Sequence, residues 1–485
     1  MASRRDELNG CAFSRRRTLA AFLRPSGGGN EQDAPRALRG LVPGLVAAAL
    51  AVAGAGAYGM VRPSAPPGWQ QADAVIVGSQ STTRFVMLGG VLHPVLNIAS
   101  ARLLLGVGST VLPVPDSVLD SGRLPHGAVV GVPYAPDSLP TAGEAGTPKL
   151  WAYCDRPGPG GRGGDERRLF VLGGADRAAV SGAGRLGRGQ ALYVRGPDGT
   201  PYLVDASGTS HVLAAGGSGA TGARRQALLA TVVFGAFAGL PQPVGAAWLA
   251  SLRAGDPVGF PAADMPGYGG PAGTVIDGAP TTVGETVQVR ATGGRLLTYV
   301  VLRDGVHRVS GFTEQLLAAM AGRTATTVLA TSVPGANAAP PFEGTRDWPQ
   351  DSVTQTNTTT SGGGATVACA VYSGRIRTPG GPVLSLWAGR SYPVDSAPGT
   401  TGVYVTPGTG LLYREVTGAG ADTGPVALLT DTGLRYPVPV DGGGDARARL
   451  GYAAVPPVPV PSSWASLLPR GPELSTAAAA RQQPR

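Results

Sequence analysis

The chain has 485 residues and a formal net charge of +9, and 76 of its residues are glycine and 44 are proline. A positive surplus this small, spread over so long a chain, is too dilute for a nucleic-acid-binding surface, and nucleic acid is not an expected partner. The glycine and proline content favours a protein rich in strands and loops over a helical bundle.

An uncharged stretch runs from residue 40 to residue 61, between Arg39 and Arg62. As a helix it would be about 33 Å long, close to the roughly 30 Å hydrocarbon core of a bilayer. Residues 1–39 carry eight arginines and four acidic residues, and positively charged flanks stay in the cytoplasm. We therefore predict a single-pass protein of the cell membrane, with a cytoplasmic basic tail, a transmembrane helix at 40–61 and an extracytoplasmic domain.

Three other interpretations of this region are open. Ala55-Gly56-Ala57 resembles a signal-peptidase site, although the preceding tail is long for a cleaved signal. Residues 14–23 contain three consecutive arginines, as twin-arginine signals do, but Pro25 and a glycine run separate them from the apolar stretch. A buried globular helix is the third alternative, and the flanking arginines argue against it.

A second uncharged stretch covers residues 226–252 and is also long enough to span a membrane. Pro241 and Pro243 interrupt it, and the repeat described below accounts for both halves as soluble elements. We do not expect a second transmembrane helix.

The three cysteines agree with this topology. Cys11 lies in the cytoplasmic tail, whereas Cys154 and Cys369 lie outside, each in an apolar, strand-like stretch. Two extracytoplasmic cysteines make one disulfide the default expectation. Two separately buried thiols are the alternative.

The most informative feature is an internal repeat of four segments that align without gaps, namely 85–95, 203–213, 300–310 and 428–438. The segments share a glycine with apolar residues on both sides: Gly90, Gly208, Gly305 and Gly433. This is the pattern of a tight β-hairpin.

A second element, Leu-x-x-Gly, recurs in three copies and ends at Gly127, Gly255 and Gly471. Trp248 and Trp464 each lie seven residues before such a glycine. Helix-like runs separate the two elements, and no second element is recognisable in the third copy. The copies are irregularly spaced, which excludes a regular solenoid.

We therefore predict an α+β fold with four hairpin-helix repeats around a discontinuous β-rich core. The predicted segments are a cytoplasmic tail (1–39), a transmembrane helix (40–61), a linker (62–83), four repeats (84–145, 201–270, 298–345 and 416–475), three pieces of the core (146–200, 271–297 and 365–415), a flexible loop (346–364) and a disordered tail (476–485).

The repeat argues against a chemical role for His93 and His211. In the gapless alignment their equivalents are Arg308 and Tyr436, so the position accepts any large, partly polar side chain. His126 and His307 have no obvious Cys, Asp or Glu partner at ligand spacing, and we predict no metal site.

Catalytic motifs are not found in the sequence. The sole lysine, Lys149, follows a proline and is not part of a Walker A loop. The Gly-rich motif at 182–187 leads into a strand-like run, whereas a dinucleotide fingerprint must open a helix. No G-x-S-x-G, H-E-x-x-H or C-x-x-C occurs. We expect no enzyme activity, no catalytic residues and no cofactor.

Three stretches carry a family resemblance: residues 90–106 (GVLHPVLNIASARLLLG), residues 151–155 (WAYCD) and residues 460–474. They resemble the EccB family, the membrane-anchored core component of actinobacterial type VII (ESX-type) secretion. The first stretch is long and specific, and the similarity extends over nearly the whole chain. The degenerate third copy and the Gly-rich insertion at 157–164 depart from the family pattern and affect loop details.

The resemblance implies a non-catalytic subunit that scaffolds the secretion channel and its extracytoplasmic face, with an elongated domain of four repeats around a central β core. The implied partners are an FtsK/SpoIIIE-type ATPase, a polytopic channel subunit, a subtilisin-like protease and further copies of the chain. Two alternatives stay open: ATP hydrolysis, which has been proposed for the family, and peptidoglycan binding, because such repeats resemble the wall-binding subunits of phage lysins.

Overall fold

The computed structural model describes residues 4–23, 38–61, 65–71, 73–158, 166–235, 240–291, 293–333, 339–358, 365–377, 381–395, 402–418, 423–439 and 445–483. Parts of the predicted cytoplasmic tail, linker, glycine-rich insertion and flexible loop therefore lie outside the described residues, as do the last two residues of the predicted disordered tail.

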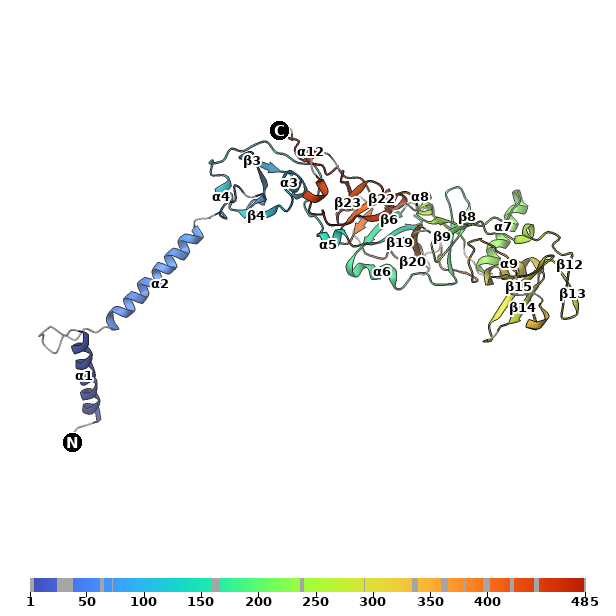
Figure 1. Ribbon diagram of the computed structural model, residues 1–485, viewed down its shortest axis with the longest axis horizontal. Coiled ribbons are helices and arrows are strands. Elements are labelled where there is room, and N and C mark those ends of the chain that lie inside the picture. Colours follow the sequence, from blue (N-terminus) through green and yellow to red (C-terminus); the bar gives the residue numbers. More distant parts are fainter. Residues whose placement is uncertain are drawn as a thin grey trace.

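The described chain forms a long rod with two separate helices at one end (Figure 1). These helices are α1 (Arg4–Leu23) and α2 (Leu38–Val61), and large aliphatic side chains of α2 such as Leu45 and Leu50 are exposed. In the described part of the chain, no helix combines the length and the apolar character needed to cross a membrane. The transmembrane assignment of residues 40–61 stays a prediction.

Four sheets of the rod share one strand order, in which an antiparallel hairpin follows a first strand and a later strand joins that first strand in parallel. Sheet 1 contains β1 (Ala74–Gly78), β2 (Arg84–Leu88), β3 (Val91–Val95) and β4 (Thr110–Val114). Sheet 2 contains β7 (Gln190–Arg195), β8 (Pro201–Asp205), β9 (Thr209–Val212) and β10 (Gln242–Pro243), with β11 (Arg253–Ala254) beside β9 and β18 (Thr354–Gln355) beside β7. Sheet 3 contains β14 (Thr286–Arg290), β15 (Leu296–Leu302), β16 (Gly305–Val309) and β17 (Thr326–Val328). Sheet 4 contains β22 (Leu411–Val416), β23 (Val426–Leu429), β24 (Arg435–Pro437) and β25 (Val458–Pro461).

One helix follows each hairpin: α3 (Ile98–Leu104), α7 (Gly219–Phe234), α9 (Gly311–Ala321) and α10 (Ala446–Arg449). Three of them begin at side chains that cap the helix N-terminus. Asn97 accepts a hydrogen bond from the Ser100 N–H, Ser310 accepts one from the Thr313 N–H, and Asp445 accepts one from the Arg447 N–H. The shorter helices are α4 (Asp116–Leu119), α5 (Ala142–Ala145), α6 (Ala178–Ser181), α8 (Ala246–Ala250), α11 (Ser462–Ala465) and α12 (Thr476–Ala479).

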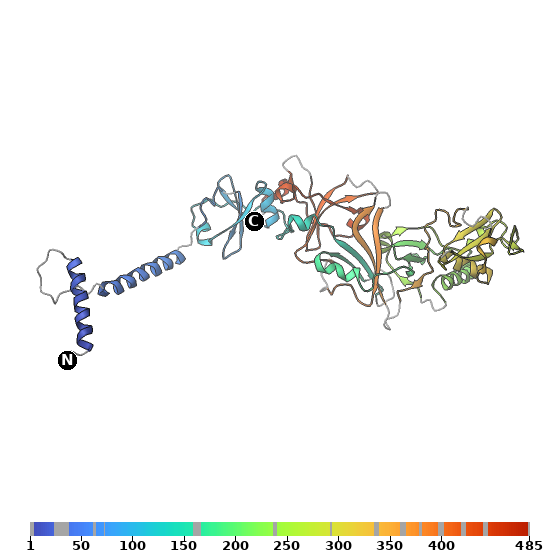
Figure 2. The same ribbon diagram turned by 60° about the horizontal axis from the view of Figure 1, so that its bottom comes forward.

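A central sheet lies in the middle of the rod, between sheets 4 and 2 (Figures 1 and 2). It contains β5 (Leu150–Arg156), β6 (Glu166–Leu172), β19 (Val367–Arg377), β20 (Gly381–Gly389) and β21 (Val403–Val405). Its strands are apolar on both faces, as expected for a sheet that is covered on both sides. On one face Trp151 and Tyr372 pack with residues of sheets 2 and 4, and on the other Phe170 and Leu172 surround the cysteines.

The predicted disulfide is present in this central sheet. Cys154 on β5 and Cys369 on β19 are directly opposite in the antiparallel register and form the bond. Both residues are fully buried. The bond joins strands whose cysteines are 215 positions apart in the sequence.

The flanking sheets associate in pairs that do not follow the chain order. Helix α3 packs into one core with sheet 4, and helix α9, which follows sheet 3, packs with α7 and sheet 2 into another. The chain therefore runs outward through sheet 1, the central sheet, sheet 2 and sheet 3, and it returns through the central sheet to sheet 4 (Figure 1).

The Leu-x-x-Gly segments lie in parallel beside the last strand of each hairpin, as β11 does beside β9. Their glycines pack against a ring on that strand: Gly127 against His93, Gly255 against His211 and Gly471 against Tyr436. The two histidines also donate their Nδ1–H to the carbonyl of the residue after the glycine: His93 to Ala128 at 2.9 Å and His211 to Asp256 at 2.8 Å. The two sequence elements of the repeat thus meet at a contact between a ring and a glycine.

The gapless alignment is wrong by one residue in sheet 3. Leu302 pairs with Gly305, so Gly305 begins β16, whereas Gly90 lies in the turn before β3. His307 pairs with Val300 as His93 pairs with Val86, and His307 donates to the Pro340 carbonyl at 3.0 Å. The buried His307, not the exposed Arg308, is therefore the equivalent of His93. The segment around Pro340 lies beside β16, the position that a Leu-x-x-Gly segment takes beside the other hairpins. The sequence has no recognisable Leu-x-x-Gly motif for this third copy.

Several predicted boundaries also need correction. Each sheet includes a strand before its hairpin that lies outside the predicted repeat: β1 lies in the predicted linker 62–83, and β7, β14 and nearly all of β22 lie in the predicted core pieces. A lone hairpin is marginally stable, and this third strand completes it. Within the predicted core piece 271–297, β12 (Pro271–Ile276) and β13 (Ala279–Thr282) form a separate two-stranded sheet.

The predicted flexible loop and disordered tail are also wrong for the residues that the structure describes. In the loop 346–364, Trp348 is buried and β18 pairs with β7. In the tail 476–485, Ala479 of α12 is buried, and the Gln483 N–H donates to the Val129 carbonyl at 2.9 Å. Both segments are ordered by contacts with residues distant in the sequence, namely β7 for the first and Val129 for the second.

Replacing Cys154 with serine should lower the free energy of unfolding by about 2–5 kcal/mol, because the disulfide restricts the unfolded chain. Urea unfolding of the full-length protein in detergent measures the change, and Cys11→Ser is the matched control with no expected effect. If Cys154 and Cys369 both react with a thiol reagent in the native, oxidised protein, the bond is not formed.

Gly255→Ala should destabilise the protein by about 1–3 kcal/mol, because a side chain would overpack this contact. A Cβ at Gly255 would lie 2.6 Å from His211 Cε1, and one at Gly471 would lie 2.7 Å from Tyr436 Cε1. Gly143→Ala in α5 is the control, since a Cβ there meets open space. Equal stability of Gly255→Ala and the unmodified protein would contradict the assigned contact.

Candidate functional site

His211 lies among carboxylates where sheet 2 meets the segment that follows sheet 3. It is fully buried on β9, and its Nδ1–H donates to the Asp256 carbonyl at 2.8 Å. Asp205 Oδ2 lies 4.0 Å from Nε2, and Asp347 Oδ1 lies 3.9 Å from Nδ1. These four residues form what we call the His211 cluster.

Hydrogen bonds hold the three aspartates in place. Asp205 Oδ1 accepts from the N–H of Ser207, from the Ser207 hydroxyl and from the N–H of Thr209, at 2.7–3.0 Å. Asp256 and Asp347 each donate a backbone N–H to the carboxylate of the other, at 2.8 and 3.1 Å. The Asp205 carboxylate is therefore fixed by its own loop, and the carboxylates of Asp256 and Asp347 are each fixed by the backbone of the other.

The charges in this cluster stabilise one another. Burial alone would lower the pKa of His211, but the Asp205 carboxylate, the Asp256 carbonyl and the charge of Asp347 outweigh burial and raise this pKa. Burial alone would raise the pKa of Asp205, but His211, Ser207 and the Thr209 N–H outweigh it and lower this pKa. Each of the two groups thus favours the charged form of the other.

The cluster is not arranged for catalysis. A general base must reach the proton that it removes from a substrate, and the His211 ring has no exposed surface. Among the described residues, no group of three or more His, Cys, Asp or Glu side chains could hold a metal ion. The cluster can hold the segments of Asp256 and Asp347 against β9, and its charge can change when His211 gains or loses a proton.

The sequence did not identify the aspartates of this cluster. Asp256 and Asp347 come from segments far from His211 in the chain, so no spacing signal links them to it, whereas Asp205 lies in the same hairpin as His211. The interpretation of His211 as a packing residue was therefore incomplete.

The other histidines occupy separate places. His93 and His307 belong to sheets 1 and 3, and the His126 Nε2–H donates to the Leu119 carbonyl at 3.2 Å. His307 Nε2 lies 3.1 Å from the Oδ1 of Asp304, three positions before it in the chain. The structure does not bring the four histidines together.

The two sequence features closest to nucleotide-binding motifs are engaged in packing. Lys149 is only 1% exposed, and its Nζ donates to Glu144 Oε2 at 2.6 Å. The glycine motif 182–187 is a loop beside β20, and the Trp387 indole N–H donates to the Ala183 carbonyl at 2.8 Å. Neither presents a free lysine or an open helix N-terminus to a phosphate.

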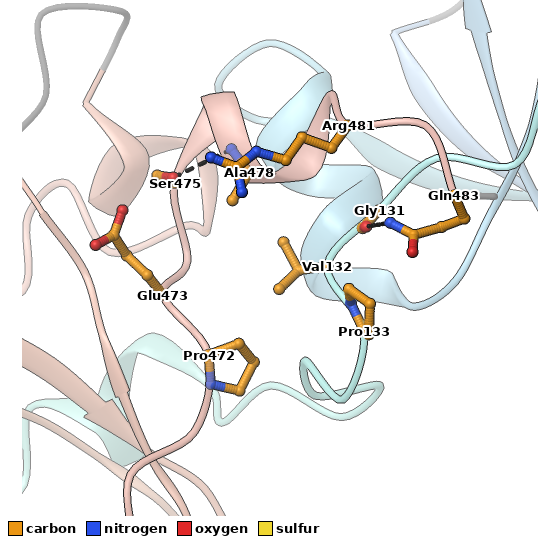
Figure 3. Close-up of a pocket in the computed structure, with 9 residues that line it drawn as sticks. All are labelled: Gly131, Val132, Pro133, Pro472, Glu473, Ser475, Ala478, Arg481 and Gln483. Atoms are coloured by element: carbon orange, nitrogen blue, oxygen red, sulfur yellow. Dashed lines mark hydrogen bonds between the residues drawn. The ribbon is translucent and has the colours of Figure 1, made fainter.

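A cavity of about 360 Å³ lies between sheet 1 and the C-terminal segment (Figure 3). Gly131 and Pro133 line one side, and Pro472, Glu473 and Arg481 line the other. The Gln483 side-chain amide donates to the Gly131 carbonyl at 2.7 Å across its edge. The cavity marks the place where the end of the chain closes onto sheet 1.

Comparison with known proteins relates this architecture to one family. The family model described as "Type VII secretion system ESX-1, transport TM domain B" matches residues 1–484. The protein named ESX-3 secretion system ATPase EccB3 of Mycobacterium tuberculosis H37Rv is 28% identical over 475 residues, covering 90% of this chain and 82% of that protein. Its namesake from Mycolicibacterium smegmatis is 26% identical over 464 residues, with the same coverage.

Solved structures show the same fold. A chain in an intact ESX-5 inner membrane complex superposes with a TM-score of 0.61 at 23% identity, covering all of this chain and 96% of that one. A chain of the EccB3 dimer from the ESX-3 core complex gives a TM-score of 0.58 at 22% identity, covering 84% of this chain and all of that one. With the family model matched from residue 1 to residue 484, the chain belongs to the EccB family of type VII secretion membrane components.

Proposed function

We propose that this chain is a structural subunit of a type VII secretion membrane complex, which scaffolds the channel and its extracytoplasmic face. The match of the family model to residues 1–484 carries this proposal. The rod supports it, because a long row of sheets offers surfaces for assembly along its length (Figure 2).

We further propose that residues 40–61 anchor the rod in the membrane, with residues 1–39 in the cytoplasm. The stretch has no charged residue and arginines flank it. Val42, Leu45, Val46, Leu50 and Val52 of α2 are exposed, which lipid contact would satisfy. Helix α2 also stands apart from the folded sheets (Figure 1).

In this proposal sheets 1 to 4 are copies of one repeated unit. Their common strand order supports this, as do the aromatic or imidazole rings at one register position, His93, His211, His307 and Tyr436. The central sheet is then the element that joins two pairs of units.

The proposed partners are an FtsK/SpoIIIE-type ATPase, a polytopic channel subunit, a subtilisin-like protease and a second copy of the chain. The similar solved chains come from an ESX-5 inner membrane complex and from an EccB3 dimer, which supports assembly of this kind. The cytoplasmic tail is the part within reach of the ATPase, and the rod is the part within reach of the extracytoplasmic subunits.

We propose that the subunit itself has no catalytic role, and the buried Lys149 and the packed 182–187 loop support this. ATP hydrolysis is the second candidate function, because the EccB3 and EccB2 relatives carry "ATPase" in their names. ATP hydrolysis by the purified protein that a single substitution in one pocket removes, while the fold is kept, would favour this second candidate.

Alkaline phosphatase fused after Arg485 should be active, because that enzyme works only outside the cytoplasm and the arginines keep the tail inside. A reporter that works only in the cytoplasm should be silent at the same position. The reverse pattern would contradict the proposed topology.

Deleting residues 2–35 should prevent co-purification with the ATPase subunit, because the tail is the proposed cytoplasmic contact. The deletion keeps Arg36 and Arg39 beside the apolar stretch, so the topology should be unchanged. His93→Tyr, which copies the ring of sheet 4, is the control and should leave assembly intact. An ATPase subunit that still co-purifies with the deletion variant would place the contact elsewhere.

A further inference from the structure

The segment from Glu343 to Trp348 fastens sheet 3 to sheet 2. Glu343 Oε1 accepts the Ser310 N–H at the start of α9, at 2.7 Å. Asp347 exchanges two hydrogen bonds with Asp256 beside β11. Trp348 is buried in the core that α7 and α9 share, and its indole N–H donates to the Pro257 carbonyl at 3.0 Å. The attachment of the distal end of the rod thus passes through the His211 cluster.

The protonation state of His211 changes the contacts that this cluster can make. A carbonyl only accepts, so the Nδ1 that faces the Asp256 carbonyl carries a proton in either state. In the neutral ring Nε2 is a buried acceptor that faces a carboxylate, and within the described residues it has no hydrogen-bond partner. In the charged ring Nε2–H is a donor aimed at Asp205.

The nearby guanidinium groups are engaged with other partners. Arg253 on β11 donates to the Thr209 hydroxyl at 2.6 Å, and Arg346 pairs with Asp264 at 2.7 Å. The carboxylates that face the ring are therefore those of Asp205, at the end of β8, and Asp347, from the segment after sheet 3, whereas Asp256 faces the ring with its backbone carbonyl. Protonated His211 supplies a positive charge beside Asp205 and Asp347, while the charge of Arg346 acts on Asp256.

We propose that His211 is a proton-operated latch between sheets 2 and 3, which fastens the distal end of the rod when protonated and loosens it when neutral. This proposal goes beyond the proposed role in secretion, because the latch is a property of the fold and can be tested without the secretion partners.

The direction of the effect follows from the groups in the cluster. The pKa of His211 is raised from its usual 6.5, so its stabilisation is complete below that value and is lost as the pH rises through the folded-state pKa. The pKa of Asp205 is lowered from 3.8, so its contribution is lost only in stronger acid. The joint is therefore tightest in mildly acidic medium.

Hydrogen exchange of the full-length protein in detergent tests the latch, with rates corrected for the intrinsic effect of pH. Between about pH 5.5 and about pH 8, the range in which a histidine titrates, protection of the Glu343–Trp348 amides should fall several-fold. His211→Tyr should remove this pH dependence, since Tyr436 shows that the position accommodates a tyrosine ring against its glycine. His93→Tyr, at the equivalent position in sheet 1, should leave the dependence unchanged.

Asp205→Asn provides an independent test that does not alter the ring. Its amide oxygen can keep the three hydrogen bonds from Ser207 and Thr209, while the charge that faces Nε2 is removed. The loss of protection should then move to lower pH. Protection that stays constant or rises with pH in the unmodified protein, or a pH dependence that survives in His211→Tyr, would overturn the proposal.

Discussion

The pairing of β5 with β19 is the contact on which the rest of the rod depends. These strands lie on opposite passes of the chain, one leading out to sheets 2 and 3 and the other returning to sheet 4. Their register places Cys154 opposite Cys369 and creates two apolar faces at once. Contacts between residues so far apart in the sequence carry a large entropic cost of loop closure. The disulfide and the burial on both faces offset this cost.

The flanking sheets attach to this pairing through a few large side chains. Trp248 of α8 donates its indole N–H to the Ala368 carbonyl of β19 at 3.1 Å, and Trp464 of α11 packs against Tyr372 of the same strand. The buried Asp155 on β5 accepts the Gly245 N–H at the start of α8, at 2.8 Å. Sheets 2 and 4 therefore dock on the central sheet through equivalent helices, and sheets 3 and 1 are attached through them.

Elements with a local sequence signal could be predicted from the sequence. A glycine between two apolar runs identifies a hairpin, and apolar stretches around Cys154 and Cys369 predicted buried strands that could be bridged. Features whose partner comes from elsewhere in the chain could not be predicted. No sequence motif shows that β1, β7, β14 and β22 pair with the hairpin that follows each of them. The one-residue shift at Gly305 depends on the length of the turn, which is known only from the strand pairing. Asp256 and Asp347 beside His211 were missed for the same reason, because they come from segments outside its hairpin.

The burial of Lys149 determines how the neighbours of this protein can be mapped. It is the only lysine in the sequence and is 1% exposed, so amine-directed cross-linkers and labels have no accessible lysine to modify. Cys11 on α1 is an exposed free thiol, while the other two cysteines are bonded to each other. A single maleimide probe would therefore report from the N-terminal helix alone, and cross-linking along the rod must rely on carboxylate chemistry.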